Sequence, residues 1–258
     1  MLFYRQSDIP EIPEFTWMLS CFCSKGLLNR AHAYKAVVDK NLETGRPPDD
    51  GINIGLYSYP VLMAADILLF GANVVPVGSD QKQHVEIARD IAQAFNSTYG
   101  DLLVLPEPLI DEAVMTIPGL DGRKMSKSYD NVIPIFLPRN QLRKQVMRIV
   151  TDSTPVEAPK DPDRCNVFAI YRYFAAPAEV TAMRQRYLAG GIGYGEVKEV
   201  LFELLDTHFG AAREQYHAYL ADKASIDRTL NAGAEKARAI AAPTLARLRK
   251  AIGIQSKV

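Results

Sequence analysis

The stretch PVLMAADILLF, residues 60–70, and the run VVPV that follows it at residues 74–77 indicate the fold of this chain. The first stretch predicts a helix, because Pro60 suits the first helical position and Gly71 stands where a helix stops. The second is a short β-branched run, which is typical of a buried strand. The chain is therefore predicted to run from a helix directly into a strand.

The residues that follow repeat this alternation. Gly78-Ser79-Asp80 turns the chain, and Asp80 is predicted to be the N-cap of a further helix. That helix carries apolar residues at roughly helical spacing: Val85, Ile87, Ala88, Ile91, Ala92 and Phe95. The run Leu102-Leu103-Val104-Leu105 predicts a second buried strand. Strand, turn and helix in this order indicate an α/β fold, with a parallel sheet and helices on its faces.

The second half of the chain carries helical patterns only. Apolar residues recur at helical spacing in two stretches: Leu142, Val146, Ile149 and Val150, then Val197, Val200, Leu201, Leu204, Leu205 and Phe209. No strand signal of comparable strength follows Phe136. We therefore predict two domains, an α/β domain over residues 1–136 and a helical domain over residues 137–258.

Composition narrows the function classes. The chain is 48% hydrophobic and 23% charged with a formal net charge of zero, which argues against indiscriminate nucleic-acid binding. No apolar run approaches the roughly 20 residues of a membrane span. Cys21, Cys23 and Cys165 have poor zinc spacing, and His84 lacks metal-ligand companions. We expect a cytosolic protein with reduced cysteines, a structural His84 and no protein-bound metal.

Two lysines and two serines alternate in KMSKS, residues 124–128, just after a loop that contains Pro118, Gly119 and Gly122. Lysines on such a loop can bring ammonium groups to a polyphosphate, and the hydroxyls can donate to its oxygens. This pattern predicts a site that stabilises charge on a transferring phosphoryl or nucleotidyl group. A solvated basic turn is the alternative.

One carboxylate, Asp66, lies in the middle of the nearly all-apolar helix predicted over 60–70. Tyr59, Met63 and Asp66 are spaced i, i+4 and i+7, so they share one helix face. An aromatic ring, a thioether and one acceptor suit a flat apolar ligand that carries a single N–H or O–H donor. The alternative is a core aspartate that bonds a neighbouring backbone group, because a buried carboxylate needs a partner.

The turn at Gly78-Ser79-Asp80 precedes a predicted helix N-terminus. Free backbone N–H groups and the helix dipole favour polar ligands or anions at such a place. Asp80 has capping as its ordinary role, and the two roles are compatible.

These motifs together resemble a known enzyme family. KMSKS resembles the mobile ATP loop of class I aminoacyl-tRNA synthetases. The segments YPVLMAADIL at 59–68 and PVGSDQKQH at 76–84 are similar to those of bacterial tryptophanyl-tRNA synthetases. The resemblance implies a Rossmann-like catalytic domain over 1–136, incomplete at its N-terminus, and an all-helical domain over 137–258 that recognises the tRNA anticodon.

The resemblance also implies roles for single residues. It implies that Asp66 accepts the indole N–H of tryptophan, that Met63 and Tyr59 line its pocket, and that Gln81 lies near its ammonium group. It assigns ATP to these residues: Gly78, Ser79, Asp80, Ile117, Lys124, Met125, Ser126, Lys127 and Ser128. Lys124 and Lys127 are the expected catalytic contacts to the phosphates.

The implied reaction is the ATP-dependent activation of L-tryptophan to its adenylate, followed by transfer to tRNA(Trp). Mg²⁺ is expected to accompany ATP, and the resembled enzymes are cytoplasmic homodimers without a membrane partner. Tyrosyl-tRNA synthetases, the sibling family, usually have a Gln where this chain has Met63-Ala64, which favours tryptophan. The sequence is also compatible with a non-catalytic tryptophan- or RNA-binding paralogue and with a generic nucleotidyltransferase.

The second signature of class I synthetases, a HIGH-like motif of the form PSGxxHLGN, has no match in this chain. The first residues, FYRQSDIPEIP at 3–13, resemble a segment that follows that motif inside family members. A fragment, a misplaced start and a natural derivative are the open explanations. We expect low stability and no adenylation from these residues alone, because missing strands leave unpaired sheet edges.

Overall fold

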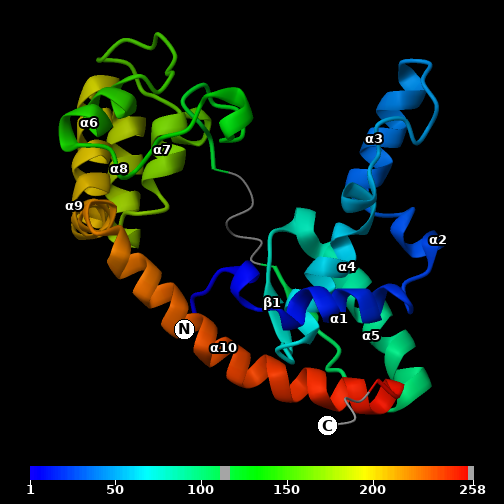
Figure 1. Cartoon of the computed structure of the whole chain (residues 1–258). Coiled ribbons are helices and arrows are strands. Elements are labelled where there is room, and N and C mark those ends of the chain that lie inside the picture. The colour runs from blue at the N-terminus through cyan, green and yellow to red at the C-terminus, as the bar shows by residue number, and fades with distance from the viewer. Residues whose placement is uncertain (111–116, 255–258) are drawn as a thin grey trace. The chain divides into compact units, whose positions relative to one another are not determined.

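The computed structural model describes residues 1–110 and 117–254. Its contacts divide the chain into two compact units. Unit 1 comprises Met1–Ala113 and Ala224–Val258, and unit 2 comprises Val114–Lys223. This division differs from the two consecutive domains expected from the sequence, because the last helix belongs with the N-terminal part of the chain (Figure 1).

Unit 1 is mostly helical. Its elements are η1 (Gln6–Asp8), α1 (Glu11–Ser20), α2 (Lys25–Leu28), α3 (His32–Glu43), α4 (Ile54–Leu68), β1 (Val74–Pro76), η2 (Ser79–Gln81), α5 (Lys82–Tyr99), β2 (Glu107–Leu109) and α10 (Lys223–Ile252). Helix α4 packs against both α1 and α5, and its Val61, Ala64, Ala65 and Leu68 are fully buried. The core of unit 1 is therefore built around α4.

Helix α4 begins earlier than predicted. Asn53 is its N-cap, because the Asn53 side chain accepts the Leu56 backbone N–H at 2.8 Å. The predicted start at Pro60 is wrong, and this proline lies inside the helix. The predicted stop is close to the observed one, since α4 ends at Leu68 and Gly71 follows with a φ of 63°.

The sheet contains β1 and β2, which pair in parallel with Val74 opposite Glu107 and Pro76 opposite Leu109. Helix α5 connects them, so the predicted strand–helix–strand unit with a parallel pairing is present. The described residues contain this two-stranded sheet rather than a larger Rossmann-like one, and Val74 is 52% exposed rather than buried.

The second strand does not lie where the sequence predicted it. The prediction over Leu102–Leu105 is wrong, and β2 occupies Glu107–Leu109 instead. Asn96, near the end of α5, explains the shift. Its side chain accepts the N–H groups of Leu102 and Leu103 at 3.2 and 2.9 Å and donates to the Leu103 carbonyl at 2.8 Å. These backbone groups are satisfied without a neighbouring strand.

Helix α10 is part of unit 1. Its buried residues, which join the same core as α4, are Gly233, Ala234, Ala237, Ala241, Leu245 and Leu248. Arg238 pairs with the buried Glu11 of α1 at 3.1 Å, and Arg249 pairs with Glu14. A Cβ at Gly233 would lie 1.8 Å from the Phe3 carbonyl oxygen, so only glycine allows this approach of the N-terminal segment. In the view of Figure 1, α10 passes obliquely below α1.

In the described part of unit 2, the regular structure is helical apart from the bridge between Pro118 and Lys124. Its described elements are η4 (Lys127–Tyr129), α6 (Arg139–Met147), η5 (Pro162–Arg164), α7 (Asn166–Tyr171), α8 (Pro177–Ala189) and α9 (Tyr194–Ala221). Helices α6 and α7 both pack on α9. Their core includes the fully buried Leu142, Phe168, Tyr187 and Phe202. Across the residues that the structure describes, no helix combines the length and apolar character of a membrane span.

Candidate functional site

Asp66, the predicted acceptor, is half-buried on α4 and is held by one other side chain. The amide nitrogen of Gln6 donates to Asp66 Oδ2 at 2.7 Å. The second oxygen, Oδ1, receives no hydrogen bond from a described residue. Burial raises the pKa of Asp66, and the bond from Gln6 opposes that rise. The carboxylate thus has one fixed oxygen and one oxygen left for a donor.

Tyr59 and Met63 lie on α4 at the predicted helical spacing from Asp66. The Tyr59 hydroxyl lies 2.6 Å from His84 Nε2 on α5, and Met63 packs partly buried against the core of unit 1. A cavity of about 410 Å³ is lined by Gln6, Ile12, Ser58, Tyr59 and Leu62, among others. Neither Met63 nor Asp66 lines this cavity, so it brings only Tyr59 of the three predicted residues together with Gln6.

The predicted nucleotide turn is exposed at the start of α5. Gly78, Ser79 and Asp80 are all exposed, and Ser79 and Asp80 lie in η2. The prediction of Asp80 as a helix N-cap is wrong, because Gly78 precedes η2 and Gln81 precedes α5. Gln81 donates from its amide to Asp80 Oδ2 at 3.0 Å. The turn therefore presents solvent-facing polar groups beside α5.

The KMSKS loop in unit 2 has a folded base. The N–H of Met125 donates to the Ile117 carbonyl at 2.8 Å, and the N–H of Gly119 donates to the Arg123 carbonyl at 2.7 Å. Both Ile117 and Met125 pack against the core of unit 2. Two of the predicted ATP residues therefore anchor the loop, and the segment between them closes on itself.

Asn131 holds this loop from behind and is only 2% exposed. Its oxygen accepts the Ser126 N–H at 2.8 Å, and its amide donates to Asp121 at 2.7 Å and to the Lys124 carbonyl at 3.1 Å. A Cβ at Gly119 would lie 2.4 Å from the Asn131 side chain, so this contact requires glycine. The bond from Asn131, and then those from Arg123, lower the pKa of the Asp121 carboxyl.

The reactive groups of the loop face solvent. Lys124, Lys127 and Ser128 are exposed, and neither lysine forms an ion pair with a described residue. The Ser126 hydroxyl accepts the Ser128 N–H at 3.2 Å and so begins η4. Two ammonium groups without ion pairs, on a loop whose ends are held by hydrogen bonds, suit the binding of a polyphosphate.

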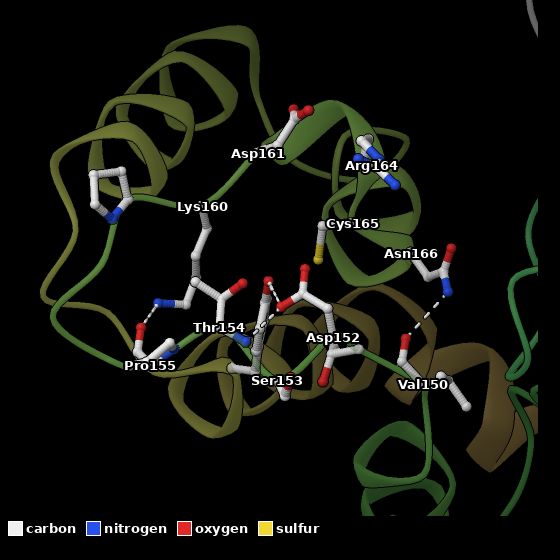
Figure 2. Close-up of a pocket in the computed structure, with 13 residues that line it drawn as sticks. Val150, Asp152, Ser153, Thr154, Pro155, Lys160, Asp161, Arg164, Cys165 and Asn166 are labelled. Carbon is white, nitrogen blue, oxygen red and sulfur yellow. Dashed lines mark hydrogen bonds between the residues drawn. The ribbon is translucent and has the colours of Figure 1, made fainter.

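A separate cavity of about 810 Å³ lies in unit 2 (Figure 2). The buried Lys160 at its wall donates to the carbonyls of Pro155, Val156 and Ala158, and Asp152 accepts from the Tyr194 hydroxyl at 2.8 Å. None of the predicted site residues lines it. Because Lys160 and Asp152 are both occupied by hydrogen bonds to neighbouring groups, they stabilise the loop around the cavity. Across residues 1–110 and 117–254, no cluster of three His, Cys, Asp or Glu side chains is arranged to hold a metal ion.

Three residues hold the predicted site residues in place: Gln6, His84 and Asn131. Gln6 and Asn131 were not singled out from the sequence, and His84 was expected to be structural but without its partner Tyr59. Gln6 is 60 positions from Asp66, and His84 is 25 positions from Tyr59. No spacing rule connects such pairs. Burial, and then the charge of His32, lowers the pKa of the 4%-exposed His84, while Asp80 opposes this.

The chain is similar to a known protein family and to individual members of it. Residues 1–210 match the model of the tRNA synthetases of class I (W and Y). The tryptophan–tRNA ligases of Pseudomonas aeruginosa and Pseudomonas putida are 58% and 56% identical over 257 residues, which is 98% of this chain. The chain spans 57% of the length of these two relatives.

Solved structures are similar as well. The tryptophanyl-tRNA synthetase of Campylobacter jejuni, in complex with ADP and tryptophan, is 46% identical with a TM-score of 0.85. The match covers 98% of this chain and 76% of that one. The enzyme of Mycoplasma pneumoniae is 29% identical with a TM-score of 0.73, over 99% of this chain and 77% of its own.

Replacing Asp66 by asparagine is expected to change how stability depends on pH. A carboxyl whose pKa is raised on folding contributes stability at low pH, and this contribution is lost as pH rises through the folded-state pKa. Asparagine does not ionise and still offers an oxygen to Gln6. Relative to that of the wild type, the free energy of unfolding of Asp66→Asn should therefore increase as pH rises above about 4, the ordinary pKa of an aspartate. Urea titrations at several pH values measure this difference, and a difference independent of pH would contradict it.

The substitution Asn131→Ala is expected to loosen the base of the KMSKS loop. It removes three hydrogen bonds and leaves the Ser126 N–H and the Lys124 carbonyl without their partner. Amide exchange in residues 120–130 should accelerate by about 10- to 100-fold, as read by hydrogen–deuterium exchange with mass spectrometry. The control is Asn140→Ala, at an exposed position of α6, which should leave exchange in this loop unchanged. Equal exchange in Asn131→Ala and the wild type would show that Asn131 does not hold the loop.

Proposed function

The chain belongs to the tRNA synthetases of class I (W and Y), and we propose that the protein it represents is a tryptophan–tRNA ligase. The observation that carries the proposal is the Asp66 carboxylate on α4. One of its oxygens is fixed by Gln6, and the other receives no hydrogen bond from a described residue. A half-buried acceptor in an otherwise apolar helix selects a ligand with a single N–H donor, and the indole of tryptophan is such a ligand.

In the proposed amino-acid site, Asp66 Oδ1 accepts the indole N–H. Met63 and Tyr59 provide apolar and aromatic walls on the same helix, and Gln81 receives the ammonium group once its amide turns from Asp80. A ligand without the indole donor leaves the carboxylate oxygen desolvated and unpaired. That penalty, rather than added attraction, gives such a site its selectivity.

The proposed first step joins this amino acid to ATP. A carboxylate oxygen of tryptophan attacks the α-phosphorus, the bond to the bridging oxygen breaks, and pyrophosphate leaves with the electron pair. We assign the ribose or base of ATP to the turn at Gly78, Ser79 and Asp80, and an adenine contact to Ile117. ATP brings Mg²⁺ on its phosphates. No protein nucleophile takes part, so positioning and charge stabilisation carry the catalysis.

The KMSKS loop supplies the charge in this step. Lys124 and Lys127 place ammonium groups on the phosphates, where negative charge grows as pyrophosphate departs. Ser126 and Ser128 add hydroxyl donors, while Met125 keeps the loop on the core of unit 2. The free state of both lysines supports this role, because a lysine already in an ion pair would have to break it first.

The second step transfers the tryptophanyl group to a ribose hydroxyl of tRNA(Trp) and releases AMP. We propose that residues 137–258 contribute to anticodon recognition and that the ligase is a homodimer in the cytoplasm.

Arg139 and Arg143 form ion pairs with Asp206 and Glu199, respectively, both at 2.7 Å. Basic residues without an ion pair to a described residue, Lys144, Lys236, Arg247 and Lys250, are the better candidates for contacts to the tRNA backbone.

The experiment that tests the function is tryptophan-dependent exchange between ATP and pyrophosphate by the native protein. Wild-type protein should exchange with L-tryptophan and not with L-tyrosine or L-phenylalanine. Lys127→Ala should lower the exchange rate by about 10²- to 10³-fold, because one contact to the developing charge is lost. The tryptophan dissociation constant, measured by calorimetry, should stay within about twofold.

The matched control is Lys40→Ala, which removes an exposed lysine on α3 and should leave the rate unchanged. Exchange that responds to tyrosine rather than tryptophan would contradict the amino-acid assignment. Equal rates for Lys127→Ala and the wild type would contradict the role of the loop.

A further inference from the structure

The hydroxyl of Tyr59 is held by a buried histidine. Its oxygen lies 2.6 Å from His84 Nε2, and the two rings pack with their centroids 5.3 Å apart. Tyr59 comes from α4 and His84 from α5, two helices in direct contact within unit 1. In either tautomer of the imidazole, this short bond fixes where the Tyr59 hydroxyl points.

His84 makes this bond although its other ring nitrogen, Nδ1, lacks a hydrogen-bond partner among the described residues. The side chain is 4% exposed, and this nitrogen is buried. An unpaired buried nitrogen destabilises the fold, whereas an apolar side chain of similar size at the same place would not. Packing alone therefore does not explain a histidine at this position, and the bond to Tyr59 is the one hydrogen bond that its side chain makes with a described residue.

Tyr59, whose hydroxyl His84 holds, also lines a cavity. Together with Ser58 and Leu62 of α4, Tyr59 lines the cavity of about 410 Å³ that Gln6 also lines. Gln6 in turn donates to Asp66. Two predicted tryptophan contacts, Asp66 and Tyr59, are thus each held by a side chain from another element. His84 itself does not line the cavity.

We propose that His84 is a positioning residue for the amino-acid site, which it serves by holding the Tyr59 hydroxyl and, through it, the wall that Tyr59 gives to the tryptophan pocket. This inference rests on the proposed tryptophan–tRNA ligase function. His84 touches neither substrate nor the reacting atoms, so its effect is on the binding of tryptophan and not on the rate of the chemical step.

The test compares the variants His84→Leu, Tyr59→Phe and their combination with the wild type in pyrophosphate exchange by the native protein. Each single change should raise the KM for tryptophan by about tenfold, with kcat and the KM for ATP within about twofold. The double variant should show no larger rise than the larger single one, because both changes remove the same bond. His84→Leu should not lower the thermal midpoint, since it removes the unpaired Nδ1.

Two further variants separate positioning from a general effect on α4. His84→Gln, whose terminal amide reaches the place of Nε2, should bring the KM for tryptophan within about threefold of the wild type. Tyr57→Phe removes the same atom from a tyrosine two positions earlier, whose hydroxyl bonds the Lys25 carbonyl and Asn29 instead. It should leave the KM for tryptophan unchanged.

An unchanged KM for tryptophan in Tyr59→Phe or His84→Leu, in an active wild-type background, would overturn the inference while the proposed function stands. Multiplying effects in the double variant, about a hundredfold in total, would overturn it as well. If the wild-type protein shows no exchange with tryptophan, the proposed function fails, and the inference fails with it.

Discussion

The packing of α4 between α1 and α5 is the constraint on which unit 1 depends. Helix α4 is apolar on nearly every face, so only burial by helices on more than one side stabilises it. That burial fixes the rotation of the helix, and rotation decides where each of its few polar groups points. Asp66 and Tyr59 therefore owe their positions to the apolar residues around them, above all to Val61, Ala64 and Leu68.

A buried helix that carries polar groups needs partners for them, and the partners come from distant parts of the chain. Gln6 reaches Asp66 from the N-terminal segment, and His84 reaches Tyr59 from α5. Unit 2 uses the same arrangement at the KMSKS loop, where Asn131 satisfies backbone groups from behind. In each case a bonded residue fixes the site, and the groups proposed to meet a ligand stay free: Asp66 Oδ1, Lys124 and Lys127.

Local sequence signals predicted much of this. The apolar stretch at 60–70, the β-branched run at 74–77 and the following periodic helix correspond to α4, β1 and α5, and the parallel pairing was expected from their order. The end of α4 was predictable because Gly71 provides a left-handed residue there. These features depend on neighbours within a few residues, which periodicity and turn chemistry describe well.

Features set by single side chains at a distance were not predictable. Asn53 caps α4, so the helix begins earlier than the predicted start at Pro60. Asn96 accepts the backbone N–H groups of Leu102 and Leu103, which lie in the run that predicted a strand. The place of α10 in unit 1 depends on the burial of its apolar face, and Arg238 and Arg249 meet acids more than 200 positions away. No short-range pattern in a single sequence contains such contacts.

In the proposed site, Asp66 selects its ligand through one N–H donor. The most direct measurement is calorimetric binding of L-tryptophan to the native protein, compared with its analogue in which sulfur replaces the indole N–H. The two ligands have nearly the same shape, so the comparison isolates the donor. We predict that the sulfur analogue binds at least about a hundredfold more weakly. Equal dissociation constants for the two ligands would show that Asp66 does not select the indole donor.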